Sequence, residues 1–318
     1  MATSREHSTA HTLTIAAPPA VVYGLVADVS RWPALFGPAV YVRQIELTER
    51  SQHFEIWAIV NGDIAHWESR RSLDPSRLRI EFAQVRSQHP VEAMRGEWIC
   101  RELAPGRTEV TLGHTFTAAD DRQSTVESIR RALNSNSSRE LAALAAAADH
   151  GYHVSDVVFS FSDSVDIDGS QVGAAYEFID RAELWPSHLP HVASADCAEM
   201  SPGVQRLTMD SRTDDGTVHT TESLRICRPG EWIAYKQLRT PALLRGHSGV
   251  WTFRHAEHGP GRITARHTVV LDPHAAVMTF GSGGVGDAKK YVREQLRRNS
   301  SITMTHAVEY ARKVTVRP

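Results

Sequence analysis

The sequence predicts an α+β protein built as a tandem duplication, in which each copy wraps a curved antiparallel sheet around a long C-terminal helix and encloses a cavity. Period-two runs of apolar residues, divided by turn residues, fill the stretch from about residue 40 to 117. A long helical pattern follows over 124–148, and the same series then begins again. We therefore expect two domains, at residues 1–150 and 151–318.

The bulk composition is that of a packed globular chain. Among 318 residues, 41% are hydrophobic and 23% charged, and the formal net charge is -2. A nearly neutral chain gives no reason to expect nucleic acid or a membrane surface as a partner. No apolar run approaches the ~18 residues of a membrane-spanning helix, and the N-terminus lacks the apolar core of a signal peptide. Together with three unclustered cysteines, these features favour a cytoplasmic location.

The first elements are a strand over residues 11–16 and a helix that begins at Pro18-Pro19. Proline is tolerated in a first helical turn, and apolar residues then recur at helical spacing as far as Val29. We expect Trp32-Pro33 to end this helix, because the residue before a proline is disfavoured in the helical conformation.

Six strands should follow and form one antiparallel meander, since short turns join them. Their expected limits are 41–47, 54–60, 65–73, 78–85, 92–103 and 108–117. The long helix over 124–148 is the only element large enough to cover the sheet. A polar run at 134–138 interrupts its apolar stripe, which indicates either a helix over a partly wet cavity or a solvent-exposed kink.

The second half repeats these features at a nearly constant spacing. Trp185-Pro186 lies 153 residues after Trp32-Pro33, and a strand over 164–167 and a helix over 172–179 precede it. At the same spacing, Gly96, Trp98 and His114 recur as the identical residues Gly249, Trp251 and His267. A final helix is expected over 287–312, with Asn299 at the place of Asn136.

One strand of each copy carries an unusual set of side chains. Alternate strand residues share a face, so Trp67, Ser69 and Arg71 should lie together. Thr221, Ser223 and Arg225 occupy the equivalent positions in the second copy. The face lines a cavity in one interpretation, and in the other it is an exposed strand face with a snorkelling arginine.

Four motifs resemble those of a known family. They are Arg31-Trp32-Pro33-Ala34-Leu35-Phe36, Trp67-Glu68-Ser69-Arg70-Arg71, Leu73-Asp74-Pro75 and Met94-Arg95-Gly96-Glu97-Trp98. In this order they resemble the two-domain aromatase/cyclases of bacterial type II polyketide synthases, which have the helix-grip fold of START and Bet v 1-like proteins. The resemblance covers both copies.

The resemblance implies an enzyme of polyketide and antibiotic biosynthesis. Such enzymes bind a ketoreduced poly-β-ketone tethered to an acyl carrier protein, direct C7–C12 aldol closure of the first ring, and remove water to make the ring aromatic. The expected partners are therefore the acyl carrier protein, the ketosynthase and the ketoreductase, and no cofactor or metal is expected. The alternative is a non-catalytic carrier of the same fold for an apolar ligand.

The resemblance also assigns residues in the first copy. The family's pocket arginine and serine fall on Arg71 and Ser69, and the expected substrate-binding residues are Trp32, Phe36, Trp67, Met94, Trp98 and Asn136. Single-domain relatives place a pocket tyrosine shortly after the Trp-Pro pair. Here Gly37-Pro38-Ala39 stands at that place and Tyr41 is expected out of register, which puts a tyrosine acid in doubt.

The chemistry of these residues suggests roles. Arginine keeps its proton in proteins, so Arg71 is expected to stabilise enolate-like oxygens rather than act as an acid. Ser69 is expected to hold a substrate hydroxyl or relay a proton. Histidine is the natural proton acceptor, and His114 is preferred to His66, which faces away from Arg71 by strand parity. The alternative for His114 is an ordinary buried histidine.

The second copy keeps part of this set. Its counterparts are Trp185, Ser223, Arg225, Trp251 and His267. Thr221 replaces Trp67 and Leu189 replaces Phe36, so we expect the first copy to hold the main active site. The recurring serine and arginine leave a two-site scheme open.

Two further stretches suggest other functions. The G-x-G-x-x-G sequence at 281–286 lacks a βαβ unit and is expected to be a flexible loop over the cavity mouth rather than a nucleotide site. The last helix carries a group of basic residues, namely Lys289, Lys290, Arg293, Arg297 and Arg298. We expect them to form either a solvated helix face or a docking surface for an acidic carrier protein.

Overall fold

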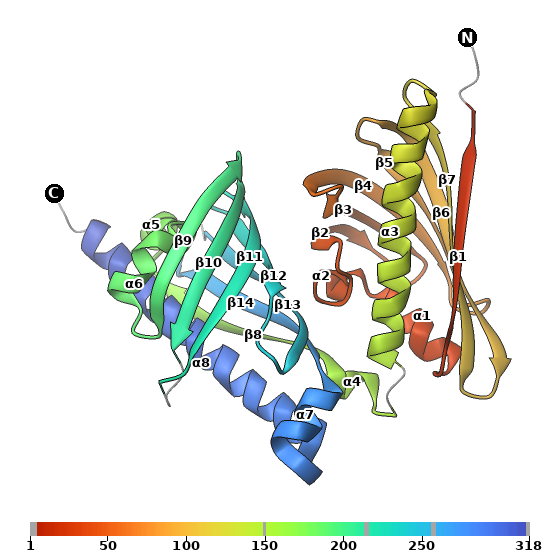
Figure 1. Cartoon of the computed structure of the whole chain (residues 1–318). Helices are drawn as coiled ribbons and strands as arrows, with labels where there is room; N and C mark the ends of the chain where they lie inside the picture. The colour runs from red at the N-terminus through yellow and green to blue at the C-terminus, as the bar shows by residue number, and fades with distance from the viewer. Residues whose placement is uncertain (1–4, 149–150, 213–215, 256–258, 316–318) are drawn as a thin grey trace. The chain divides into compact units, whose positions relative to one another are not determined.

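The predicted tandem duplication is present in the structure, a computed structural model that describes residues 5–148, 151–212, 216–255 and 259–315 (Figure 1). The chain divides into two compact units, Met1–Val154 and Ser155–Pro318, four residues beyond the boundary expected from the sequence. Each unit contains a seven-stranded antiparallel sheet and ends in a long helix. The predicted α+β helix-grip architecture is therefore confirmed.

The first unit follows the predicted order of elements. They are β1 (His7–Ile15), α1 (Pro19–Ala27), a 3-10 turn (Val29–Arg31), α2 (Trp32–Leu35), β2 (Ala39–Leu47), β3 (Ser51–Val60), β4 (Asp63–Asp74), β5 (Arg79–Arg86), β6 (Val91–Ala104), β7 (Arg107–Ala118) and α3 (Gln123–Ala148). The sheet order is β1-β7-β6-β5-β4-β3-β2, which is the expected meander with β1 added beside β7. Helix α3 runs along one face of this sheet (Figure 1).

The helix α3 contributes the apolar cover of that face. Ile129, Leu141 and Leu144 are buried, with 5% or less of their surface exposed. Because a sheet exposes one apolar face and a helix one apolar stripe, this packing buries both. A smaller cluster of Phe116, Ala118, Val126 and Ile129 closes the end of the unit where β7 leads into α3.

The Trp32-Pro33 pair does not end a helix, which corrects the sequence expectation. Helix α1 already ends at Ala27, and Trp32 and Pro33 open the short helix α2. Proline is tolerated at the second helical position because no intrahelical hydrogen bond is required of it there. The Trp32 indole Nε1 donates to the Val26 carbonyl oxygen at 3.2 Å and holds this turn against the end of α1.

The second unit repeats the series with a few added short helical elements, of which α7 is the longest. Its elements are α4 (Val154–Val157), β8 (Val158–Ile167), a 3-10 turn (Gly169–Gln171), α5 (Val172–Asp180), a 3-10 turn (Ala182–Leu184), α6 (Trp185–His188), β9 (Val192–Ser201), β10 (Val204–Arg212), β11 (Val218–Arg228), β12 (Trp232–Arg239), β13 (Leu244–Arg254), β14 (Gly261–Leu271), α7 (Pro273–Phe280), a 3-10 turn (Gly281–Gly283) and α8 (Gly284–Thr315). The order β8-β14-β13-β12-β11-β10-β9 mirrors that of the first sheet.

The glycine-rich stretch at 281–286 is not a loop that follows a strand, as the sequence suggested. Helix α7 intervenes after β14, with its N-terminus capped by the Asp272 carboxylate. Gly281 and Gly284 have φ of 59° and 43°, backbone angles that favour glycine, and the stretch makes the sharp junction between α7 and α8. The unexpected helix arises because Asp272-Pro273 is a good helix start.

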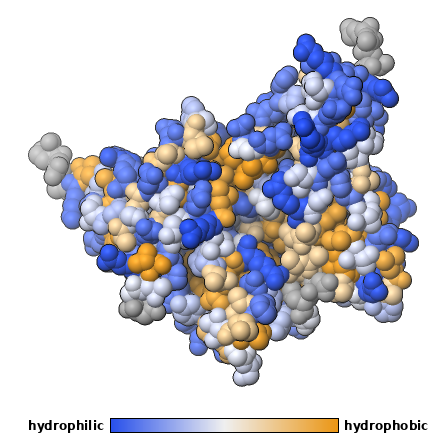
Figure 2. Space-filling view, viewed as in Figure 1, coloured by the Kyte–Doolittle hydropathy of each residue, from blue (hydrophilic) through white to orange (hydrophobic). Residues whose placement is uncertain are grey.

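The surface is mixed in character. On the face seen in Figure 2, hydrophilic and hydrophobic residues are interspersed over both units. Within the described residues, no helix is long and apolar enough to cross a membrane.

Candidate active site

A cavity of about 220 Å³ lies within the first unit, and residues of the sheet, α2 and α3 line it. All nine residues expected from the sequence to form the site contribute to its wall. They are Trp32, Phe36, Trp67, Ser69, Arg71, Met94, Trp98, His114 and Asn136. The two intervening positions on β4, Glu68 and Arg70, do not line the cavity, as the period of two requires.

The strand face of β4 that carries Trp67, Ser69 and Arg71 lines a cavity and is not exposed. Arg71 and Ser69 are only 3% and 5% exposed, so this is a buried cavity wall and not a surface with a snorkelling arginine. His66, on the other face, stacks on Trp57 with ring centroids 4.3 Å apart. Tyr41 also packs against Trp57, at 5.6 Å, and does not line the cavity.

The Arg71 guanidinium is hydrogen-bonded through one of its three nitrogens. Its Nη2 donates to the carbonyl oxygen of Val26 at 2.9 Å, near the end of α1, where helical carbonyls lack intrahelical donors. The guanidinium lies 4.8 Å from the centroid of the Trp32 ring. The Nε and Nη1 groups are buried and have no hydrogen-bond partner among the described residues. Arg71 thus lies in the cavity wall with two donor nitrogens that no described residue uses.

The charge on Arg71 survives its burial. Loss of solvation lowers the pKa of the guanidinium to about 9, and interaction with Tyr23 opposes this change. The group is therefore still a cation at neutral pH. A fixed cation with free donors in a poorly solvated cavity stabilises developing negative charge on oxygen.

Aromatic rings form the apolar part of the wall. Phe36 stacks on Trp98 with an interplanar angle of 9° and centroids 6.2 Å apart, and Trp32 meets Phe36 edge-on at 5.4 Å. Such flat, rigid surfaces fit a planar or extended unsaturated chain. The three tryptophans predicted to converge do so.

Both copies have a glycine at the same strand position, Gly96 and Gly249, and the packing around it explains why. A Cβ atom at Gly96 would lie 2.2 Å from the Gly113 carbonyl oxygen and 2.4 Å from Cζ of Phe82. At the equivalent Gly249, a Cβ atom would lie 2.4 Å from the hydroxyl oxygen of Tyr235. Each glycine therefore makes room for an aromatic ring from the neighbouring strand. Phe82 lines the cavity but was not expected from the sequence, because its partner glycine is far from it along the chain.

Ser69 and His114 bring polar atoms to the same cavity. The Ser69 hydroxyl donates to the carbonyl oxygen of Ala83 at 3.2 Å, which leaves its oxygen lone pairs to accept a hydrogen bond. Burial, assisted by the neighbouring His11, lowers the pKa of His114 to about 4. The His114 imidazole is therefore neutral at pH 7, and its buried Nδ1 has no partner within the described part of the chain. It can accept a proton.

Helix α3 supplies the opposite wall and accounts for its polar run. Asn136 donates from Nδ2 to the Ile59 carbonyl oxygen at 3.5 Å, and Arg139 donates to its Oδ1 at 3.1 Å. Ser137 is 1% exposed and also lines the cavity. The helix is continuous through the polar run, with Asn136 and Ser137 in the cavity wall and Asn134, Ser135 and Ser138 exposed. Glu140, one turn further on, lines the cavity too and was missed by sequence reasoning. Its spacing of four residues from Asn136 is the signal that would have revealed it.

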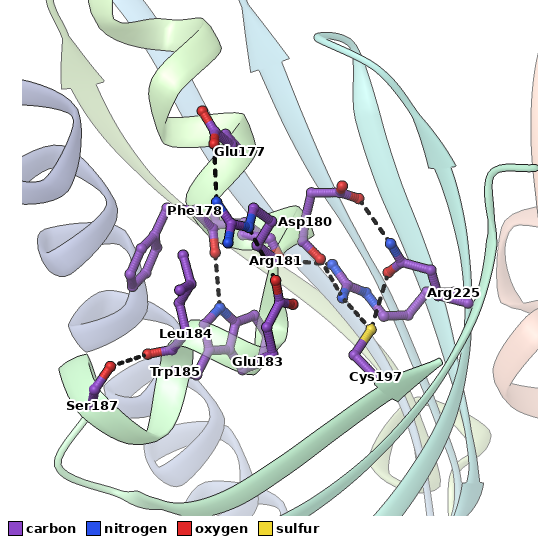
Figure 3. Close-up of polar contacts among 12 residues, drawn as sticks. Glu177, Phe178, Asp180, Arg181, Glu183, Leu184, Trp185, Ser187, Cys197 and Arg225 are labelled. Carbon is purple, nitrogen blue, oxygen red and sulfur yellow. Dashed lines mark hydrogen bonds and ion pairs between the residues drawn. The ribbon is translucent and has the colours of Figure 1, made fainter. Parts of the chain in front are cut away.

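The second unit buries its equivalent residues but arranges them differently. Trp185, Ser223, Arg225, Trp251 and His267 are all less than 9% exposed. Figure 3 shows Arg225 pointing at the end of α5, where its Nη2 donates to Ile179 O at 2.6 Å and its Nη1 to Asp180 O at 3.0 Å. The Cys197 sulfur is a further contact of Nη1, at 3.7 Å.

His267 belongs to a separate polar cluster in the second unit. Its Nδ1 lies 2.9 Å from the Tyr235 hydroxyl and 3.2 Å from Nε2 of His247. Burial lowers the pKa of His267 to about 4, and burial and the facing His267 lower that of His247 as well. In the first unit, Phe82 and Met94 stand in place of Tyr235 and His247. The residues searched for metal ligands, those that the structure describes, contain no group of three His, Cys, Asp or Glu side chains placed to hold a metal ion.

The fold and this cavity define a helix-grip protein with an internal cavity lined by aromatic rings and a buried cation. Comparison with known proteins identifies its family. Residues 6–149 match the model of the family described as polyketide cyclase/dehydrase and lipid transport. The chain is 50% identical over 309 residues to the granaticin polyketide synthase bifunctional cyclase/dehydratase of Streptomyces violaceoruber, covering 96% of this chain and 95% of that protein.

A second relative and two solved structures agree. The actinorhodin polyketide synthase bifunctional cyclase/dehydratase of Streptomyces coelicolor is 42% identical, over 96% of this chain and 97% of its own. The di-domain ARO/CYC BexL from the BE-7585A biosynthetic pathway matches with a TM-score of 0.79 and 40% identity, over 98% of this chain and all of its own. The di-domain ARO/CYC StfQ from the steffimycin pathway matches with a TM-score of 0.79 and 32% identity, over 96% and 99% of the two chains. The chain belongs to the two-domain polyketide aromatase/cyclases and is a polyketide cyclase/dehydratase.

Proposed function

We propose that the first unit binds a once-ketoreduced poly-β-ketone chain attached to an acyl carrier protein, directs C7–C12 aldol closure of its first ring, and removes water to make that ring aromatic. The single observation that carries this proposal is a buried arginine, Arg71, in a cavity wall with aromatic rings, two of whose nitrogens have no partner among the described residues. Aldol closure and loss of water both generate an enolate oxygen, and Arg71 is the charge that can stabilise it.

The neighbouring side chains support the same chemistry. Neutral His114 can accept the proton from the carbon that attacks the distant carbonyl group. The oxygen of Ser69 can accept a hydrogen bond from a substrate hydroxyl, since its own proton is used by Ala83. Trp32, Phe36 and Trp98 can hold the folded chain against one wall, so that the two reacting carbons meet.

The carrier protein, the ketosynthase and the ketoreductase remain the proposed partners. Helix α8 offers a basic surface to an acidic carrier protein. Lys289 and Arg297 on this surface are already paired with Asp156 and Asp163. Lys290 and Arg293 are therefore the better candidates for an intermolecular contact. Charge reversal at both should slow turnover of the tethered chain at low salt, and an unchanged rate would dispose of this docking surface.

The direct test is reconstitution with the minimal synthase and the ketoreductase, with identification of the product rings. Arg71→Ala should remain folded and release shunt products that lack the aromatised first ring. Arg225→Ala is the matched control in the second unit, compared per folded molecule. If only Arg225→Ala altered the products, the active site would lie in the second unit. If neither did, the chain would act as a carrier or chaperone for the polyketide.

A further inference from the structure

A cluster of three buried polar atoms lies where the edge strand β1 runs beside β7, and none has a hydrogen-bond partner among the described residues. The atoms are Thr9 Oγ1, His11 Nδ1 and His114 Nδ1. Thr9 stands directly opposite His114 in the register of the two strands, and His11 follows Thr9 on the same face of β1. Opposed side chains have Cβ atoms about 4.5–5.5 Å apart, so one small molecule between them can bond to both. Of the three residues, His114 alone also lines the cavity, and the cluster therefore lies behind the cavity wall.

In the second unit, the equivalent histidine has a hydroxyl group on one side and an aromatic ring on the other. His267 Nδ1 lies 2.9 Å from the hydroxyl oxygen of Tyr235, which reaches it across Gly249. On the other side, Phe161 stands opposite His267 in the register of β8 and β14, and the two rings stack with centroids 5.0 Å apart.

In the first unit, the hydroxyl group and the aromatic ring have exchanged sides. Phe82 occupies the place of Tyr235 and meets the His114 ring edge-on, with centroids 5.4 Å apart. Thr9 occupies the place of Phe161. Because Phe82 has no hydroxyl group, the polar atoms available to His114 Nδ1 are those of the cluster on β1.

This arrangement decides which nitrogen of His114 can act on a substrate. Its Nδ1 is buried toward the cluster, so Nε2 is the ring nitrogen that a molecule in the cavity can reach. Burial lowers the pKa of His114 to about 4, and the ring is therefore neutral at pH 7, with a proton on one nitrogen only. For Nε2 to accept a proton, the ring's own proton has to be on Nδ1. The hydrogen-bond partner of one ring nitrogen decides which tautomer is present.

We infer that Thr9 and His11 are positioning residues, which hold one ordered water against His114 Nδ1 and so keep Nε2 as the proton acceptor. This inference rests on the role of His114 in the proposed function. A buried water makes about three hydrogen bonds to polar groups that otherwise lack partners, and the cluster supplies such a set. His114 Nδ1–H donates to the water, and the water donates to His11 Nδ1 and to Thr9 Oγ1.

Nitrogen NMR of the full-length protein, labelled with isotopic histidine, tests the tautomer directly. The His114 signal is identified by its loss from His114→Gln. In the wild type at pH 7, it should be the signal of a neutral ring with the proton on Nδ1. In the double variant Thr9→Val, His11→Phe, this preference should be lost, because the Nδ1 proton no longer has an acceptor.

Reaction rates test the consequence for catalysis. Thr9→Val keeps the size of the side chain and removes its hydroxyl group. With the chain supplied by the synthase, formation of the first ring should slow about tenfold, a part of the ~10²–10⁴-fold contribution of a positioned base. Thr9→Ser retains the hydroxyl group and should restore the rate. Thr12→Val is the matched control and should leave the rate unchanged, because Thr12 lies on the exposed face of β1 and bonds to Thr111 at 3.2 Å.

A crystal structure adds a readout that, like the tautomer, does not depend on catalysis. It should show one ordered water within about 3.2 Å of all three atoms of the cluster. Absence of that water, a wild-type His114 protonated on Nε2, or an unchanged tautomer in the double variant would overturn the inference, as would a wild-type rate for Thr9→Val. If His114→Gln itself formed the ring normally while the water and the tautomer were as expected, the role of His114 in the proposed function would fail and the water site would stand.

Discussion

Arg71 and Arg225 occupy equivalent places in the two units and do different things there. Both lie on the inner face of a central strand, and both donate from Nη2 to a carbonyl oxygen near the end of the first helix of their unit, that of Val26 or Ile179. The Nη1 of Arg225 donates to the next carbonyl oxygen, that of Asp180, whereas Nη1 and Nε of Arg71 have no hydrogen-bond partner among the described residues. In the second unit the arginine is bonded to two backbone carbonyl oxygens, whereas in the first unit it can still donate hydrogen bonds to a ligand.

The neighbours of each arginine explain the difference. In the first unit, the Gln52 side chain donates to the carbonyl oxygen of Ala27 at 2.9 Å, so that this acceptor is already used. In the second unit, Asp180 stands in place of Ala27, and its carboxylate draws the equivalent Gln205 to itself at 3.3 Å. The freed carbonyl of Asp180 then takes Arg225. A single side chain, alanine or aspartate, thus redirects a glutamine and decides whether an arginine is available.

Removal of the two arginines should give the largest contrast. Arg71→Ala should reduce ring formation about 10²–10³-fold, the usual effect of losing one donor to a developing oxyanion. Arg225→Ala should instead lower the free energy of unfolding by about 2–5 kcal/mol, because two buried carbonyls lose their donor. Product analysis and urea unfolding of both variants measure the two effects. Equal effects of the two substitutions on both measurements would contradict the comparison.

The glycine shared by both units offers the next test. Gly96→Ala should cost about 1–3 kcal/mol, because the added methyl group overlaps the Gly113 carbonyl and the Phe82 ring. It should also push Phe82 toward the cavity and weaken substrate binding. Gly24→Ala is the control, since nothing lies within 4 Å of its Cβ position on α1. Thermal unfolding distinguishes them, and a Gly96→Ala protein as stable as the control would remove this explanation of the repeat.

Gln52→Ala tests whether the glutamine keeps Arg71 available. Without Gln52, the Ala27 carbonyl loses its donor, and Arg71 should turn toward it as Arg225 does toward Asp180. We expect ring formation to fall about tenfold, equivalent to ~1.4 kcal/mol in the barrier. The matched variant in the second unit is Gln205→Ala, which should leave product formation unchanged. A normal rate for Gln52→Ala would show that Arg71 does not depend on this contact.

Acidification should have the smallest effect and should distinguish the units by stability. A buried histidine with a depressed pKa stays neutral in the folded state while the unfolded chain binds a proton below about pH 6.5, so stability falls as pH decreases toward the folded pKa. Burial lowers the pKa of His191, His247 and His267 in the second unit and of His114 in the first.

The second unit should therefore lose more stability between pH 7 and pH 5.5, by about 1 kcal/mol per buried histidine. Hydrogen exchange followed peptide by peptide reports each unit separately. His247→Met introduces the residue found at the equivalent position of the first unit, Met94, and should reduce this acid sensitivity. The control is His274→Met at an exposed position, which should leave the acid sensitivity unchanged. Equal acid sensitivity of the two units would contradict the expectation.

The sequence by itself determined the repeat, the meander and the strand face that lines the cavity. Strand alternation is a local geometric rule, so the positions of Trp67, Ser69 and Arg71 on one face followed from their spacing alone. The recurrence of Gly96 and Gly249 fixed the alignment of the two units before any contact was known. These features depend on neighbours along the chain, and a sequence displays such neighbours directly.

Only the tertiary structure decided what the wall can do. Glu140 is an unremarkable glutamate in the sequence, and only the fold places it in the cavity wall, where burial raises the pKa of its carboxyl group to about 8. The availability of Arg71 depends on Gln52 and Ala27, which are distant in the chain and meet it only in the fold. Protonation and hydrogen-bond competition are set by burial and by contacts through space, so no local pattern records them.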